Sequence, residues 1–242
     1  MLWAVILVPA VMGVLAVLWP GRTVRRWFLL PGSLGHLAAV GGLWVTRPPS
    51  GPWLGADEPG LLFLTITSVL FLAVAAYTIG YLRRESGQTT KDAEEGFLFR
   101  NKPDATFVGC LLLFLATMSL VCLSQHLGLL WIAVEATTLV SAPLISFHRH
   151  HRSLEAMWKY LLICSVGIAL ALLGNFCLAF AAQGQGADLT LRELMEKAVY
   201  LNPTWLKTAF LLMLIGYGTK MGLAPMHTWL PDAHSEAPSM VS

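Results

Sequence analysis

Charged residues are scarce in this chain. Asp, Glu, Lys and Arg make up 12% of its 242 residues, whereas a soluble domain carries about 25% of them. Hydrophobic residues account for 56%, and the mean hydropathy is +0.64. This shortage of charge excludes an ordinary soluble domain and indicates a protein that lies in a lipid bilayer. The net charge of +2, with no dense basic patch outside short loop clusters, argues against a nucleic-acid partner.

Paired cysteine motifs are also missing. The four cysteines, Cys110, Cys122, Cys164 and Cys177, all lie inside apolar stretches, and none belongs to a CxxC pair. Such a set does not make a zinc, haem or iron–sulfur frame. We interpret these residues as packing thiols, and we expect neither a metal site nor a redox cofactor in this chain.

Long apolar stretches, in contrast, fill most of the sequence. A bilayer core of ~30 Å needs about 20 apolar residues in a helix. Seven stretches meet this need, namely residues 1–19, 27–45, 61–82, 105–124, 127–147, 160–182 and 208–226. Only two of them contain an acidic or basic residue: Glu135 lies in the fifth and Lys220 in the seventh. The sequence therefore predicts an all-α membrane protein with about seven transmembrane helices and the start of an eighth near Ala237.

The distribution of basic residues predicts how these helices are oriented. Loops after the first, third and fifth spans hold eleven Lys and Arg residues, and the loops on the opposite side hold four. Cytoplasmic loops carry the excess of positive charge, so we expect the N-terminus outside. The first span is preceded by no basic leader and followed by Arg22, Arg25 and Arg26, a pattern that does not fit a cleaved signal peptide.

A polar stretch divides the chain into two parts. Residues 83–104 contain five basic and five acidic residues, and we expect a cytoplasmic loop that separates three leading helices (1–82) from a second bundle (105–242). Within that bundle, apolar residues of 188–200 recur at the spacing of one helix face. Thr190 and Glu193 match a capping box, so a short helix is expected there on the outer surface.

Glu135 and Lys220 are ionisable residues within apolar spans. Such a residue costs ~2.5–3.5 kcal/mol at mid-bilayer on insertion scales and marks a functional site by default. With a rise of ~1.5 Å per residue, the two depths differ by roughly 6 Å, which allows a close pair. Burial raises the pKa of a carboxylate and lowers that of an ammonium group, and a nearby opposite charge reverses each shift. A lysine between these two effects suits proton exchange. A static salt bridge or an orientation device is the alternative.

Pro225 follows Lys220 closely, and Gly216, Gly218 and Gly222 surround the lysine. Proline breaks or kinks a helix, and the freed backbone groups must then face protein or water. We therefore predict that the seventh span is broken at Pro225, as in transporters with discontinuous helices. A simple packing kink is the alternative, since proline and glycine are frequent in membrane helices.

Other titratable residues flank the spans. His227 and His234 follow the break and titrate near neutrality, which makes them candidates for a relay, while an interfacial loop explains them equally well. Lys159 is a weaker candidate, because it can also extend its ammonium group to the membrane surface. A further group follows the fifth span, and for it we favour a solvated cytoplasmic loop over a metal site. That group comprises His148, His150 and His151.

Three motifs resemble those of a known family. The segment from Lys220 to Pro238 reads KMGLAPMHTWLPDAHSEAP, the run around Glu135 reads LLWIAVEATT, and Lys159 lies in EAMWKY. In this order they resemble antiporter-like, proton-conducting subunits of respiratory complex I, of Mrp-type sodium/proton antiporters and of energy-converting hydrogenases. Within this family they are most similar to the F component of hydrogenase four. The motifs cover residues 105–242, and the first three spans fit the family in layout.

The resemblance implies a role for each matching residue. Lys220 matches the family's central proton carrier on a broken seventh helix, and Glu135 matches the buried glutamate that modulates it. Lys159 matches a lysine of the sixth helix, and His227 and His234 match positions in the loop after the break. The implied proton-transfer residues are thus Glu135 and Lys220, with the other three as relay candidates.

The resemblance also implies a fold and partners. Family members have roughly fourteen helices in two inverted repeats, so this chain corresponds to the first repeat and is expected to be incomplete. Met240 stands where relatives often have proline, which is a departure at the start of the eighth helix. The implied setting is a bacterial or archaeal inner membrane, with membrane and peripheral redox subunits as partners and protons as cargo. A sodium/proton antiporter subunit and a structural anchor subunit are the alternatives.

Overall fold

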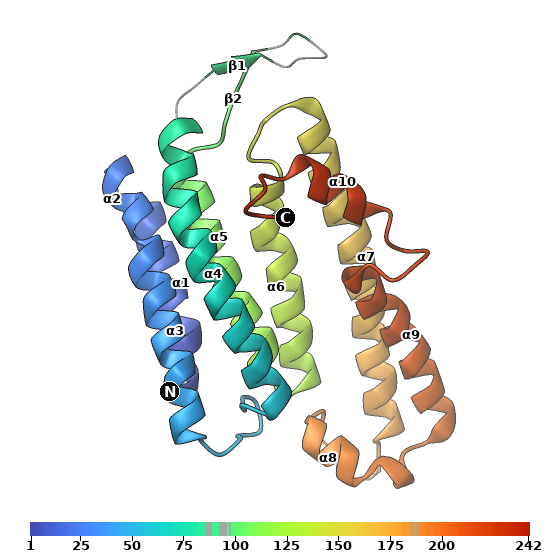
Figure 1. Cartoon of the computed structure of the whole chain (residues 1–242). Helices are drawn as coiled ribbons and strands as arrows, with labels where there is room; N and C mark the ends of the chain where they lie inside the picture. Colours follow the sequence, from blue (N-terminus) through green and yellow to red (C-terminus); the bar gives the residue numbers. More distant parts are fainter. Residues whose placement is uncertain (86–88, 92–95, 97, 185, 187) are drawn as a thin grey trace.

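Apolar helices make up almost the whole chain, as the sequence predicts (Figure 1). The computed structural model describes residues 1–85, 89–91, 96, 98–184, 186 and 188–242. The elements are α1 (Leu2–Leu18), α2 (Arg22–Trp27), α3 (Leu29–Thr46), α4 (Glu58–Glu85), β1 (Thr89–Lys91), β2 (Leu98–Arg100), α5 (Asp104–Leu123), α6 (Leu127–Ile145), α7 (His151–Ala181), α8 (Leu191–Glu196), the 3-10 helix η1 (Ala198–Tyr200), α9 (Pro203–Met221) and α10 (Trp229–Glu236).

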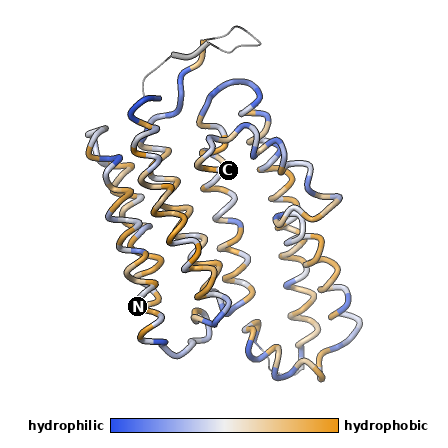
Figure 2. Tube along the Cα trace, viewed as in Figure 1, coloured by the Kyte–Doolittle hydropathy of each residue, from blue (hydrophilic) through white to orange (hydrophobic). Residues whose placement is uncertain are grey.

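Within the described residues, five helical stretches are long and apolar enough to cross a membrane. They are Thr23–Thr46, Glu58–Glu85, Asp104–Leu123, Leu127–Ile145 and His151–Ala181. The 17-residue α1 is shorter, and the 19-residue α9 is not one of the five. Figure 2 shows hydrophobic residues along the middle of the bundle and hydrophilic residues at its two ends. The chain is therefore an integral membrane protein, while the count of seven spans stays a prediction.

Two helices extend beyond the apolar stretches from which they were predicted. α7 begins at His151 instead of residue 160, and α4 continues to Glu85. The predicted loop 83–104 contains the antiparallel pair β1–β2, and its residues 86–88, 92–95 and 97 lie outside the described part of the chain. Hydropathy detects only the segment of a helix that lies in lipid, whereas the backbone ladder continues into the polar region.

The last residues turn in a way that is compatible with the prediction. Residues 237–242 form a turn in which the Val241 and Ser242 amides donate to the Pro238 carbonyl at 2.8 and 3.2 Å. The start of an eighth helix near Ala237 stays a prediction.

The basic loops gather at one end of the bundle. Figure 1 shows α2, the β1–β2 hairpin and the α6–α7 connection at the same end, and the α3–α4 connection and α8 at the other. The charge count requires these loops to share one end, while the end that faces the cytoplasm stays a prediction. The short helix on the less basic side is confirmed as α8 and η1. Its capping box is only half formed, since Thr190 accepts from the Glu193 amide at 3.4 Å but Glu193 accepts from Asp188 instead.

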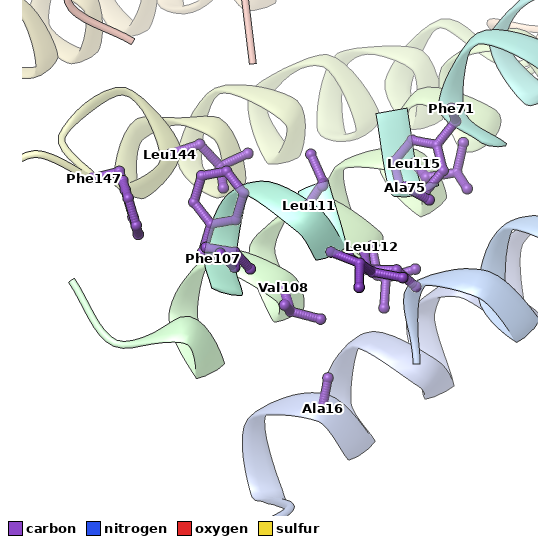
Figure 3. Close-up of a cluster of buried hydrophobic side chains, with 13 residues drawn as sticks. Ala16, Phe71, Ala75, Phe107, Val108, Leu111, Leu112, Leu115, Leu144 and Phe147 are labelled. Carbon is purple, nitrogen blue, oxygen red and sulfur yellow. The ribbon is translucent and has the colours of Figure 1, made fainter. Parts of the chain in front are cut away.

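One apolar core joins the leading helices to the second bundle (Figure 3). It runs from Ala16 on α1 through Phe71 on α4 and Phe107 on α5 to Leu144 at the end of α6, and these side chains are buried. The rings of Phe107 and Phe147 meet edge to face with centroids 4.7 Å apart. The helices on both sides of residues 83–104 thus share packing.

A polar contact that the sequence analysis did not single out lies inside the leading helices. His36 on α3 is fully buried and lies 2.7 Å from Ser119 Oγ through Nε2 and 2.7 Å from Ser68 Oγ through Nδ1. Ser119 donates its proton to the Leu115 carbonyl, so Nε2 of a neutral imidazole donates to Ser119 and Ser68 donates to Nδ1. The ring is fully satisfied and ties α3, α4 and α5 together.

Small residues bring α7 and α9 into close contact. A Cβ atom added to Gly216 would lie 2.5 Å from the Ala171 amide nitrogen and 2.6 Å from the Gly167 carbonyl oxygen. One added to Gly174 would lie 2.8 Å from Met213 Cγ. Membrane helices approach closely where such small residues face each other. This contact fixes the position of α9 and hence of Lys220 near its end.

We therefore expect Gly216→Ala to destabilise the protein. The added methyl meets backbone atoms that have no room to move, and overpacking of this kind costs ~1–3 kcal/mol. The matched control is Gly80→Ala on α4, because a Cβ there meets nothing within 4 Å and alanine is the better helix former. Thermal unfolding in detergent measures both variants. Equal melting temperatures would show that the α7–α9 contact is not tight.

Candidate functional site

A cavity of about 580 Å³ lies between α4, α5, α6 and the C-terminal segment, and Lys220 is in its wall. Leu70, Phe71, Leu111 and Leu115 are among the residues of α4 and α5 that make one side of it apolar. The polar lining contributed by α6, α7, α9 and α10 consists of Thr137, Ser141, Tyr160, Lys220 and His234. Among the described residues of this lining, Lys220 is the one Lys, Arg, Asp or Glu.

Lys220 lies at the C-terminal end of α9, where the helix stops. Gly222 adopts a left-handed backbone with φ of 81°, a conformation that glycine reaches without strain. The Leu223 amide then bonds back to the Gly218 carbonyl at 2.8 Å, as in a helix C-cap. The predicted break is confirmed, but the helix ends at Met221 before Pro225 is reached. A cation near a helix C-terminus also interacts favourably with the helix dipole.

α10 begins seven residues after Gly222 and packs against the end of α9. Trp229 is buried, and its indole Nε1 donates to the Thr219 carbonyl of α9 at 2.9 Å. The same ring packs on Tyr160 with centroids 5.1 Å apart. The Thr219 carbonyl also accepts from the Gly222 amide at 3.2 Å, so the Trp229 indole is a second donor that links the end of α9 to α10.

Hydroxyl groups hold the ammonium group of Lys220. Nζ donates to Tyr160 OH on α7 at 2.5 Å and to Thr138 Oγ1 on α6 at 2.9 Å. It also lies 4.6 Å from the centroid of the Tyr160 ring. Ser141 Oγ, one turn beyond Thr138, is 2.6 Å from Tyr160 OH and extends the chain of hydroxyls. The immediate neighbours of the cation are thus neutral groups that both donate and accept.

Glu135 lies one helical turn from this contact. It precedes Thr138 by three residues on α6, so the two side chains share a helix face with an axial offset of ~4.5 Å. Ser165 donates to Glu135 Oε1 at 3.1 Å, and Oε2 is buried without a hydrogen-bond partner among the residues that the structure describes. Within the described residues no ion pair joins Glu135 to Lys220. Glu135 and Lys220 both contact side chains where α6, α7 and α9 come together. The static salt bridge between them is not formed.

The relay candidates occupy different places. His234 is exposed on α10 and lines the cavity. His227 is exposed in the loop between α9 and α10, and in the described part of the chain its ring makes no hydrogen bond or ion pair. Lys159 is exposed and does not line the cavity; its Nζ lies 2.8 Å from Glu155 and 2.9 Å from Asp232. The structure therefore brings His234, but not His227 or Lys159, to the cavity of Lys220.

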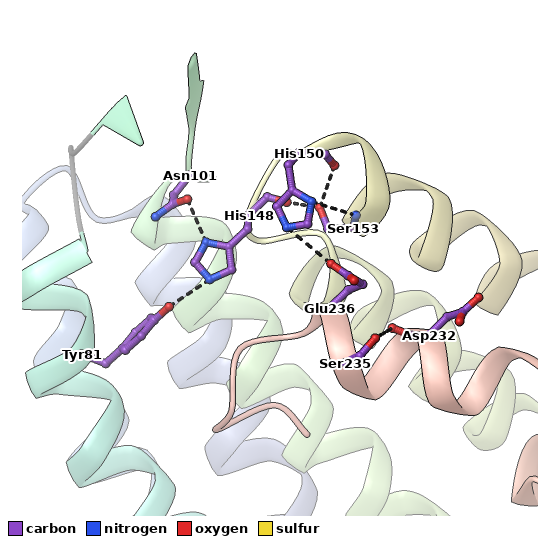
Figure 4. Close-up of polar contacts among 8 residues, drawn as sticks. All are labelled: Tyr81, Asn101, His148, His150, Ser153, Asp232, Ser235 and Glu236. Atoms are coloured by element: carbon purple, nitrogen blue, oxygen red, sulfur yellow. Dashed lines mark hydrogen bonds and ion pairs between the residues drawn. The ribbon is translucent and has the colours of Figure 1, made fainter. Parts of the chain in front are cut away.

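The histidines after α6 are less solvated than predicted (Figure 4). His148 is half-buried between Asn101 Oδ1 and Tyr81 OH, each 3.0 Å from a ring nitrogen. Burial lowers the pKa of His148, while Glu85 raises it and His150 lowers it. His150 is also half-buried, so the prediction of a solvated loop is correct only for His151. No cluster of three or more metal-ligand side chains occurs among the described residues.

Sequence reasoning missed the residues that hold Lys220. Tyr160 stands directly after Lys159 in the EAMWKY motif, and Thr138 and Ser141 follow Glu135 at steps of three. This spacing places both hydroxyls on the helix face that carries Glu135, and it was the available signal for a polar site. The sequence gives no sign that α7 and α9 bring Tyr160 and Lys220 together.

The chain is similar to several known membrane proteins. The family described as "NADH:quinone oxidoreductase/Mrp antiporter, TM" matches residues 124–242. A hydrogenase-4 component F homolog of Methylacidiphilum infernorum is 35% identical over 215 residues, which cover 85% of this chain and 43% of the relative. NADH-quinone oxidoreductase subunit N of Deinococcus radiodurans is 30% identical over 243 residues, which cover 98% of this chain and 47% of the relative.

A solved structure shares the fold. A chain of the membrane-bound sulfane sulfur reductase, an archaeal respiratory membrane complex, superposes with a TM-score of 0.79 at 19% identity. The match covers 99% of this chain and 48% of that one. Like the two relatives above, it is about twice as long as the chain described here. The segment that matches the family contains Glu135, Tyr160, Lys220 and α10, and this segment of the chain belongs to the NADH:quinone oxidoreductase/Mrp antiporter family.

Proposed function

We propose that this chain moves protons across a bacterial or archaeal cell membrane as a subunit of a redox-driven complex of the hydrogenase or NADH:quinone oxidoreductase type. The observation that carries the proposal is Lys220, held by hydroxyls in a cavity wall at the end of a broken helix. The proposal includes seven spans, an N-terminus outside and the arrangement of a first inverted repeat. The relatives of the hydrogenase and NADH-quinone oxidoreductase types support it.

The hydroxyl groups around Lys220 suit a proton carrier. An ammonium group donates to Tyr160 and Thr138, while a neutral amine accepts from the Tyr160 hydroxyl through its lone pair. Both protonation states of the lysine therefore have hydrogen-bond partners in the same place. A carboxylate at the same distance would favour the charged state alone.

Glu135 is proposed to modulate the carrier. Glu135 is about one helical turn from Thr138, the hydroxyl partner of Lys220, and away from bulk water its charge acts on Lys220 more strongly than across solvent. Its Oε2, which has no partner in the described part of the chain, leaves one position where a proton or a further donor can bind. Protonation of Glu135 would remove an attraction for the ammonium group, and Lys220 would then release its proton more readily.

Electron transfer is assigned to partner subunits. The proposed role of this chain is to bind and pass protons, with His234 as the relay candidate that lines the cavity and His227 in the adjacent loop. The family name also includes Mrp antiporters, so a sodium/proton antiporter subunit is the second candidate. A structural anchor subunit is the third, and the experiments below separate all three.

Replacement of Lys220 tests the proposal most directly. In the full-length complex, we expect Lys220→Ala and Lys220→Arg to abolish proton translocation, because alanine binds no proton and arginine does not release one. Acidification of inverted membrane vesicles measures translocation, and a pull-down measures assembly. Lys207→Ala is the matched control, since Lys207 is an exposed lysine near the other end of α9.

Unchanged translocation by an intact Lys220→Ala complex would leave only the anchor interpretation. A strict dependence of proton movement on sodium, without any electron donor, would instead favour the antiporter.

Tyr160→Phe tests the hydroxyl contact on its own. A hydrogen bond to a charged group contributes ~1.5–3 kcal/mol, which corresponds to a fall of about 10- to 100-fold in the translocation rate if the bond is needed throughout the cycle. The ring itself is kept, so packing against Trp229 should not change. Tyr200→Phe, at an exposed position of η1, provides the control, and equal rates for the two variants would contradict the proposed role of the hydroxyl.

A further inference from the structure

We propose that Lys159 is a positioning residue that fastens α10 to α7 and thereby holds the cavity wall next to Lys220. This inference rests on the proposed function, because it concerns the same site. It assigns Lys159 a role other than that of a proton relay.

The contacts of Lys159 are those of a clamp. Its Nζ lies between Glu155 Oε1, one turn back on α7, and Asp232 Oδ2 on α10, at 2.8 and 2.9 Å. Asp232 is 73 residues further along the chain, so this ion pair joins two separate elements. The three side chains are about half exposed, and they lie outside the cavity that contains Lys220.

A second contact holds Glu236, the last residue of α10 (Figure 4). His150 Nδ1 accepts from the Ser153 amide at the start of α7, so Nε2 is the nitrogen that carries the proton and faces Glu236 at 3.5 Å. Asp232 and Glu236 are four residues apart and share one face of α10. The middle and the C-terminal end of α10 are therefore attached to the polar N-terminal part of α7.

The adjacent face of α10 forms part of the site. Trp229 and Ala233 are buried and pack with Tyr160 in one apolar cluster, and Trp229, Ala233 and His234 line the cavity. α10 has eight residues, whereas isolated helices below ~12–15 residues are marginal in water. Its position therefore depends on tertiary contacts, of which the Lys159–Asp232 pair is one.

A relay requires different surroundings. A proton carrier must lose its charge in each cycle, and loss of charge would break both ion pairs of Lys159 at once. A clamp requires a permanent charge. Arginine distinguishes the two roles, because it keeps the charge and bridges carboxylates but does not deprotonate in proteins.

The experiment compares Lys159→Arg, Lys159→Ala, Asp232→Asn and the double variant Lys159→Ala/Asp232→Asn in the full-length complex. For a partly exposed ion pair we expect Lys159→Ala and Asp232→Asn each to slow proton translocation by about two- to fivefold. The double variant should be no slower than either single variant, because both remove the same contact. Lys159→Arg should stay within about twofold of wild type.

Hydrogen exchange supplies a second measurement that does not depend on transport. The amides of 229–236 should exchange faster in Lys159→Ala and Asp232→Asn, and at the wild-type rate in Lys159→Arg. Arg192→Ala is the matched control, since it removes an exposed ion pair with Glu196 on α8 and should change neither measurement.

Two results would overturn the inference while the proposed function stands. One is Lys159→Arg as slow as Lys159→Ala with normal exchange in α10, which would indicate a relay. The other is Lys159→Ala with wild-type transport and exchange. An active Lys220→Ala complex would instead overturn the proposed function, and exchange in α10 would still show whether Lys159 is a clamp.

Discussion

An ammonium group in a membrane-spanning bundle needs hydrogen-bond acceptors, and the rest of the site is arranged to supply them. Lys220 obtains two from Tyr160 and Thr138, on two different helices. Because the acceptors are neutral hydroxyls, the lysine is held without being locked in its charged state. Glu135 lies on α6, three residues before Thr138, and makes no ion pair with Lys220 in the described part of the chain. Its charge therefore acts on Lys220 without direct contact, and protonation of Glu135 would remove that effect.

This arrangement depends on how α9 is placed. Gly167 and Gly216 allow α7 and α9 to approach until backbone atoms touch, and the approach brings Tyr160 to the lysine. The end of α9 at Gly222 places Lys220 near a helix terminus, and Trp229 donates to the Thr219 carbonyl that precedes it. Close packing, the helix break and the hydrogen bonds of the lysine are thus parts of one structure.

The two halves of the chain contribute unequally to the site. α4 and α5 give the cavity its apolar side, and the leading helices share a core with α5 and α6. His36 ties α3, α4 and α5 together through fully satisfied hydrogen bonds. The family match begins at residue 124 and includes each ionisable residue to which a transport role is assigned. The groups proposed to bind protons thus lie in the second part of the chain, while both parts supply apolar residues to the cavity.

The sequence alone determined the all-α membrane class, the end of the bundle at which basic loops gather, the two charges within apolar spans and the helix break. Each of these follows from hydropathy, charge or glycine and proline within a local stretch. It did not reveal His36, the hairpin β1–β2 or the clamp on α10. The partners of Lys220 were also beyond it, since Tyr160 and Thr138 are 60 and 82 residues away. Only helix packing decides which of many distant hydroxyls meets the lysine, because such contacts leave no periodic signal in a single sequence.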